Sequence, residues 1–96
     1  MLNIEKVEQV YLACGVTDLR KAIDGLSILV TASYKLSPYD NALFVFCNRK
    51  RDKLKILHWD NGFWLYYYRL EKDMFKWPDN DEDTVKVDFD EFKWLL

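Results

Sequence analysis

The sequence has few of the residues on which catalysis usually depends. Its 96 residues include one histidine, two cysteines, three glycines and two prolines. It contains no Gly-rich phosphate loop, no Ser-His-Asp set and no metal-ligand spacing. Histidine-based acid–base chemistry would depend on His58 alone, and a packed or hydrogen-bonded side chain is the more common role for such a residue. We therefore expect no enzyme activity, no catalytic residue, no metal and no cofactor.

Long hydrophobic runs are also missing. No run approaches the ~20 apolar residues that span a bilayer, and no apolar segment follows a basic start. We therefore expect a soluble, cytoplasmic protein with no membrane partner. Cys14 and Cys47 both lie in apolar runs and have no partner ligand nearby, which favours buried, reduced thiols.

The apolar and aromatic content is high and the charge is unevenly distributed. Half of the residues are apolar and 17% are aromatic, as in an ordered globular domain. Residues 1–78 carry 12 Lys and Arg against 9 Asp and Glu, whereas residues 79–96 carry 2 against 7. The net charge of −2 thus conceals a mildly basic body with an acidic end, so it does not exclude nucleic acid as a partner. We interpret residues 1–96 as one domain, with a core over 1–78 and an acidic loop and C-terminal segment over 79–96.

The first third of the chain predicts a strand followed by a helix. Residues 9–14 form a short apolar run, and apolar side chains then recur at helical spacing over 18–33. Thr17 or Asp18 is a suitable N-cap for that helix.

The middle of the chain predicts three strands, over 43–47, 53–59 and 63–70. Asn61-Gly62 predicts a two-residue type I′ turn between the last two. We also expect a short edge strand over 85–87 and a short C-terminal helix capped by Asp88 or Asp90. The fold class is α+β, in the order β-α-β-β-β, with an antiparallel meander and the first helix packed on the sheet.

The predicted turn sets the register of the hairpin. It places Trp59 opposite Trp64, Leu57 opposite Tyr66, and Lys55 opposite Tyr68. The other face then pairs His58 with Leu65, Ile56 with Tyr67, and Leu54 with Arg69, which is an aliphatic face suited to a helix. A slip of one residue would exchange these sets.

Basic residues gather at the bend between the first two strands of the meander and beside it. Exposed Lys and Arg side chains bind phosphates without reading the base sequence. They also occur at the ends of hairpins, where their only role is to prevent another chain from pairing with the edge of the sheet. Both interpretations are open. The candidate nucleic-acid-binding residues are Arg20, Lys21, Arg49, Lys50, Arg51, Lys53 and Arg69.

The aromatic face of the hairpin is the second candidate surface. Such a face can be covered by the C-terminal helix as core, contact another protein, or stack on unpaired bases. All three interpretations are open. The candidate protein-binding residues are Trp59, Trp64, Tyr66 and Tyr68.

Several blocks, in order, resemble one family: residues 10–26, 43–57, 59–60, 62–63, 69–72 and 75–78. They are similar to the accessory protein called TnpB of the bacterial insertion sequences of the sixty-six type, which is distinct from the RNA-guided nuclease of that name. The resemblance covers about residues 7–78. The chain departs from the family pattern in having one residue fewer between Trp59-Asp60 and Gly62-Phe63, and Tyr68 where a lysine is usual.

The resemblance implies a non-catalytic accessory factor in bacterial DNA transposition, encoded beside the transposase of a mobile genetic element. It supplies no catalytic residues. We expect contact with the transposase or another element-encoded protein through the aromatic face and the C-terminal segment. The alternative is direct binding of element DNA by the basic loop.

Overall fold

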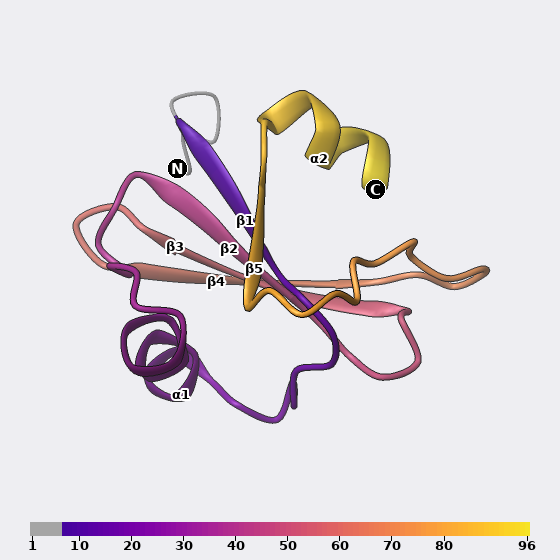
Figure 1. Ribbon diagram of the computed structural model, residues 1–96, viewed down its shortest axis with the longest axis horizontal. Coiled ribbons are helices and arrows are strands. Elements are labelled where there is room, and N and C mark those ends of the chain that lie inside the picture. Colours follow the sequence, from indigo (N-terminus) through magenta and orange to yellow (C-terminus); the bar gives the residue numbers. More distant parts are fainter. Residues whose placement is uncertain (1–6) are drawn as a thin grey trace.

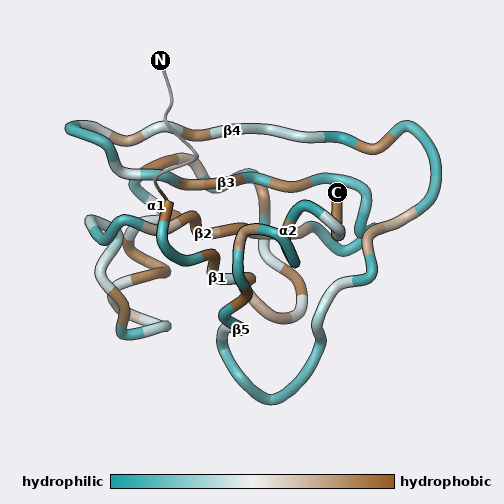
Figure 2. The backbone as a smooth tube through the Cα atoms, turned by 90° about the horizontal axis from the view of Figure 1, so that it is seen from above, coloured by the Kyte–Doolittle hydropathy of each residue, from teal (hydrophilic) through white to brown (hydrophobic). Residues whose placement is uncertain are grey.

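The computed structural model describes residues 7–96, which form a five-stranded mixed sheet between two helical layers. The elements are β1 Gln9–Ala13, α1 Ile23–Ile28, the π-helical turn η2 Leu29–Ser33, β2 Ala42–Cys47, β3 Lys53–Trp59, β4 Phe63–Arg69, β5 Thr84–Val87 and α2 Phe89–Leu95. The strand order is β4-β3-β2-β1-β5, which can be followed in Figure 2. The predicted α+β class and the β-α-β-β-β order are confirmed. Within residues 7–96, no helix is long and apolar enough to cross a membrane.

The two faces of the sheet are covered by different elements. Helix α1 lies on one side of the sheet and α2 on the other (Figure 1). Every residue of β2 is buried, which is what a strand with apolar residues in both alternating positions requires. Strand β1 runs parallel to β2, and α1 forms part of the connection between them. The other pairings are antiparallel.

Each side of the sheet has its own hydrophobic core. On the α1 side, Leu26 and Val30 pack with Phe44, Phe46 and Leu57. On the α2 side the buried cluster joins β1, β2 and β3 to α2 and to the segment after β4. It consists of Val10, Leu12, Leu43, Val45, Cys47, Leu54, Phe75, Trp77 and Phe92, together with Val7. The free Cys47 thiol is buried, and burial raises its pKa to about 11, so it stays protonated at neutral pH. Cys14 is also free but only half-buried.

The predicted start of the first helix is wrong. The helix begins at Ile23, and its N-cap Ala22 makes no side-chain cap. The Thr17 N–H donates to the Cys47 carbonyl at 2.9 Å, and Asp18 Oδ1 accepts from the Arg20 N–H at 3.0 Å. Both candidate caps are therefore used in a loop and a turn, and the helix starts only after them.

The predicted hairpin turn is also wrong. Trp59 pairs with Phe63, so the loop has three residues, Asp60 to Gly62, and Asn61 takes a positive φ of 56°. Trp59 therefore does not face Trp64, and each residue of β3 pairs one position earlier on β4 than expected. The observed register places Leu65 beside Leu57 on the α1 side, where both join the core. Burial of this pair requires the longer loop. The first helix therefore does not pack on the predicted aliphatic face, because Leu54 and Ile56 lie in the core on the α2 side.

The C-terminal expectations are confirmed. Strand β5 pairs with β1, and Asp88 caps α2 by accepting from the Glu91 N–H at 2.7 Å. The Glu91 side chain accepts from the Asp88 N–H, which completes a capping box. Phe92 is buried on the α2 side of the sheet.

Candidate functional site

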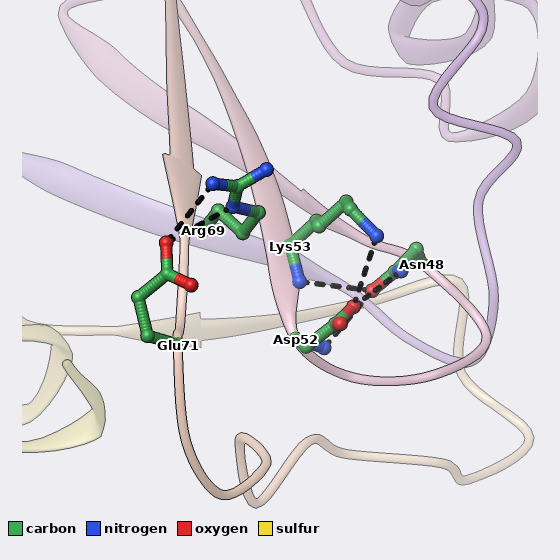
Figure 3. A network of polar contacts seen from close by, with 5 residues as sticks. All are labelled: Asn48, Asp52, Lys53, Arg69 and Glu71. Atoms are coloured by element: carbon green, nitrogen blue, oxygen red, sulfur yellow. Dashed lines mark hydrogen bonds and ion pairs between the residues drawn. The ribbon is translucent and has the colours of Figure 1, made fainter.

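The loop between β2 and β3 is organised by one asparagine. The Asn48 side-chain oxygen accepts from the Asp52 and Lys53 N–H groups at 3.1 and 3.0 Å, and its amide donates to Asp52 at 2.7 Å (Figure 3). This hydrogen bond from the Asn48 amide is the main reason why the pKa of Asp52 lies below its ordinary value. Asn48 thereby closes the loop between β2 and β3.

The same loop is held from behind by the segment that follows β4. The Leu70 N–H donates to the Asp52 carbonyl and the Phe75 N–H to the Arg51 carbonyl, both at 2.7 Å. Arg51 has a positive φ of 58°, and its guanidinium lies 3.7 Å from the Asp79 carboxylate. Arg51 is therefore drawn toward the acidic segment and away from the other basic residues of the loop.

An open groove of about 610 Å³ separates this loop from the chain that leads into α1. The hydrogen bond from Thr17 to Cys47 joins its two walls. The groove is lined by Val16, Thr17, Asp18, Leu19, Asn48, Arg49, Lys50 and Lys53. Three of the candidate basic residues thus face one groove, whose opposite wall carries a hydroxyl and a carboxylate.

The remaining basic residues extend this surface on the α1 side. Lys53 of β3 pairs with Arg69 of β4. Both side chains lie on the same face of the sheet as Leu57, which is the α1 side. The Lys55 ammonium donates to the Lys21 carbonyl at 2.9 Å, which ties β3 to the turn before α1. We call the set Arg20, Lys21, Arg49, Lys50, Lys53, Lys55 and Arg69 the basic side.

Several of these cations are already paired with carboxylates. Arg20 contacts Asp18 at 2.8 Å, and this bond holds the pKa of Asp18 well below its ordinary value. Arg69 contacts Glu71 at 3.0 Å, and Lys53 lies 3.5 Å from Asp52. Such exposed pairs contribute little to stability and can exchange for phosphate. Among the described residues, Arg49 and Lys50 form no ion pair.

The predicted aromatic face is divided between the two sides of the sheet. Trp64, Tyr66 and Tyr68 lie on the α2 side, where the Trp64 and Tyr66 rings stack 6.3 Å apart. Trp59 lies on the α1 side instead, and it contacts Tyr39 and Phe63. The shift of register separates Trp59 from the other three candidate residues.

The aromatic residues of β4 continue into a larger apolar surface. Tyr68 contacts Phe75, with ring centroids 6.0 Å apart, and the neighbouring Met74 lines a groove of about 410 Å³ together with Trp94 of α2. Trp94 is 90% exposed and Met74 67%, while Trp64 and Tyr68 are 43% and 41% exposed. We call Trp64, Tyr68, Met74 and Trp94 the apolar surface.

Sequence reasoning missed Met74 and Trp94. Trp94 was detectable, because it falls off the helical stripe that Phe89, Phe92 and Leu95 form. A tryptophan on the polar side of an amphipathic helix has no role in the core. Met74 gave no comparable signal, since its exposure depends on how the segment after β4 crosses the sheet.

His58 lies on the α2 side and is buried, as expected of a packed side chain. Among residues 7–96, its Nδ1 and the Tyr66 hydroxyl have no hydrogen-bond partner. Burial lowers the pKa of His58, and the nearby Asp60 opposes this shift. Within residues 7–96, no group of three or more His, Cys, Asp or Glu side chains could hold a metal ion.

Comparison with known proteins identifies the family. The model of the family described as IS66 Orf2-like protein matches residues 8–96. The chain belongs to this family. As an IS66 Orf2-like protein it has an accessory role associated with an insertion sequence, and the family is not a known catalytic one. The resemblance expected from the sequence is confirmed, and the family match extends through α2.

Two relatives come from Sinorhizobium fredii (strain NBRC 101917 / NGR234). The uncharacterized protein y4hO is 33% identical to this IS66 Orf2-like protein, over 92% of the chain and 77% of the relative. The uncharacterized protein y4jC is 28% identical, over 100% of the chain and 83% of the relative. No solved structure matches the chain.

Proposed function

We propose that this IS66 Orf2-like protein is a non-catalytic binding module that contacts the transposase, or another protein of the element, through its apolar surface. The observation that carries the proposal is the exposure of Trp94 beside Met74 across one groove. When a partner covers a solvent-exposed tryptophan, a large apolar surface is removed from water. Tryptophan is also enriched among the residues that dominate binding energy. The accessory role of the family supports an element-encoded partner.

Binding of the purified chain to the transposase of its element tests this proposal. Trp94→Ala should weaken binding at least tenfold, because truncation of a central tryptophan typically costs about 2 kcal/mol or more. The exposed Ile28 on the α1 side supplies the matched control, and Ile28→Ala should bind as the wild type does. Equal affinity of the Trp94→Ala variant and the wild type would contradict the proposal.

The basic side supports a second function, direct contact with element DNA. Seven Lys and Arg residues lie on the α1 side, opposite to the apolar surface, and Arg49 and Lys50 form no ion pair among the described residues. Cations free of carboxylates gain most from phosphate contact, because they release counterions without breaking a pair. The two functions are compatible, since they use opposite sides of the sheet.

The salt dependence of binding to a DNA fragment from the element end tests the second function. The double variant Arg49→Ala/Lys50→Ala should reduce the slope of log K against log salt by about 0.9 for each phosphate that the variant no longer neutralises. Lys76→Ala/Lys93→Ala removes two cations that line grooves beside Trp94 on the α2 side and should leave the slope unchanged. Arg51 is a poor probe, because it faces Asp79. No DNA binding at low salt would exclude this function.

A further inference from the structure

Strand β4 is an unprotected edge of the sheet. It stands at the end of the strand order, and within residues 7–96 no strand pairs with its outer side. Its seven residues include no proline, glycine or lysine, and Arg69 at its end is the one charge. Edge strands of monomeric proteins usually carry such residues, because these discourage pairing with another chain.

Two backbone contacts fix which groups of β4 point outward. The Leu70 N–H donates to the Asp52 carbonyl at one end of the hairpin, and the Asp60 N–H donates to the Gly62 carbonyl at the other. Hydrogen-bonded and non-hydrogen-bonded pairs alternate along an antiparallel ladder, so even-numbered residues of β4 bond to β3. The N–H and C=O groups of the odd-numbered residues therefore point away from the sheet: Phe63, Leu65, Tyr67 and Arg69.

We infer that β4 pairs antiparallel with β4 of a second copy of this chain, about a two-fold axis at Tyr66. Odd-numbered residues must pair with odd-numbered ones, and this register engages all seven residues. Leu65 then pairs with Tyr67 of the other copy, and Phe63 with Arg69 of the other copy, as hydrogen-bonded pairs. The two sheets become one continuous sheet.

The side chains of β4 are self-complementary in this register. On the α2 side Tyr66 faces Tyr66 of the other copy and Trp64 faces Tyr68 of the other copy, in the close non-hydrogen-bonded positions. On the α1 side Arg69 lies against Phe63 of the other copy, a favourable contact between a cation and a ring. No two like charges are opposed. This complementarity identifies a second copy as the occupant of the edge.

The two-fold axis is perpendicular to the sheet, so both basic sides would face the same direction and both apolar surfaces the opposite one. Pairing of one strand buries an area at the low end of specific interfaces. We therefore expect a dimer that dissociates on dilution. The inference does not depend on the proposed function, because it is tested on the purified chain alone.

Sedimentation over a wide concentration range tests the edge directly. The wild-type chain should reach the dimer mass as concentration rises. Tyr67→Pro should remain a monomer, because it removes an outward N–H without removing a bond to β3. Tyr67→Val keeps the N–H and should still associate. A wild-type chain that stays monomeric at every concentration, or a Tyr67→Pro variant that dimerises like Tyr67→Val, would overturn the inference.

A cysteine at the two-fold axis tests the register. In a Cys14→Ser background, Tyr66→Cys brings two Cα atoms to the roughly 4.5 Å separation of a non-hydrogen-bonded pair, within the range that a disulfide spans. Glutathione disulfide should convert this variant to a covalent dimer. Trp64→Cys faces position 68 of the other copy and should remain uncrosslinked. Crosslinking of Trp64→Cys but not of Tyr66→Cys would overturn the register. If the wild-type chain is a monomer that captures another protein, and Tyr67→Pro abolishes this capture, the edge belongs to that protein and not to a second copy.

Discussion

At the scale of single residues, backbone contacts made by polar side chains position the basic side. Asn48 closes the loop that carries Arg49 and Lys50, and the Thr17 N–H attaches the opposite wall of the groove to β2. The charges themselves contribute little to this geometry, since their ion pairs are exposed. Charge can therefore be changed at Arg49 and Lys50 without changing the shape of the loop.

His58 makes stability depend on pH. Burial lowers the pKa of His58 in the folded chain. As the pH falls, the unfolded chain therefore takes up this proton before the folded chain does. The free energy of unfolding should therefore be fully retained above about pH 6.5 and should decrease as the pH falls below that value. Urea denaturation at about pH 7.5 and about pH 5.5, on either side of that value, measures the decrease, which His58→Gln should lack. The inference on His58 fails if both proteins lose the same free energy over this interval.

At the scale of elements, caps and loop lengths determine where the helices and strands begin and end. Asp88, one of the two caps that the sequence predicted, is the observed cap of α2, and its partner Glu91 is local in the chain. The start of α1 was not predictable in the same way, because the Thr17 backbone N–H bonds to the Cys47 carbonyl, in a strand far along the chain, and holds residue 17 in a loop before the helix. Local pairs can be recognised in a sequence, whereas competition from a distant group cannot.

Loss of the Asp88 cap should destabilise α2. Asp88→Ala removes the side-chain acceptor of the Glu91 N–H and should lower the free energy of unfolding by about 1 kcal/mol. Asp90 is the matched control, because it is also acidic and in the first turn but does not cap the helix. Urea denaturation should show a loss below about 0.5 kcal/mol for Asp90→Ala. Equal losses in the two variants would show that the cap does not form in solution.

At the scale of the whole molecule, two helical layers protect a sheet that is apolar on both faces. The α1 side buries its core under a helix that is adjacent in sequence to β1. The α2 side is closed by residues from the far end of the chain, Phe75, Trp77 and Phe92, and the Trp77 indole N–H donates to the Ala13 carbonyl at 2.7 Å. The C-terminal segment therefore completes the core on the α2 side, and it also carries the exposed Trp94.

Docking of α2 should account for a large share of the stability. Phe92→Ala leaves a cavity on the α2 side and should cost about 3–5 kcal/mol. Trp94→Ala, two residues away but exposed, should change the free energy of unfolding by less than about 0.5 kcal/mol. Thermal unfolding of both variants provides the measurement. If Phe92→Ala unfolds at the wild-type temperature, α2 does not pack on the sheet in solution.

Much of this architecture could be predicted from the sequence. The apolar runs indicated all five strands to within a residue or two, and helical spacing indicated both helices. The basic loop was also recognisable, because Arg49, Lys50, Arg51 and Lys53 are neighbours in the chain. The apolar surface was only half recognisable, since Met74 and Trp94 meet across a groove that forms on folding.

The sequence by itself determined that both faces of the sheet had to be covered, because β2 and β3 carry apolar residues in both alternating positions. Only the tertiary structure decided which side chains belong to which face. Asn61-Gly62 is compatible with a loop of two or three residues, and one residue of difference moves Trp59 to the opposite side from Trp64. That choice depends on burial of Leu65 beside Leu57 under α1, a contact between segments distant in the chain.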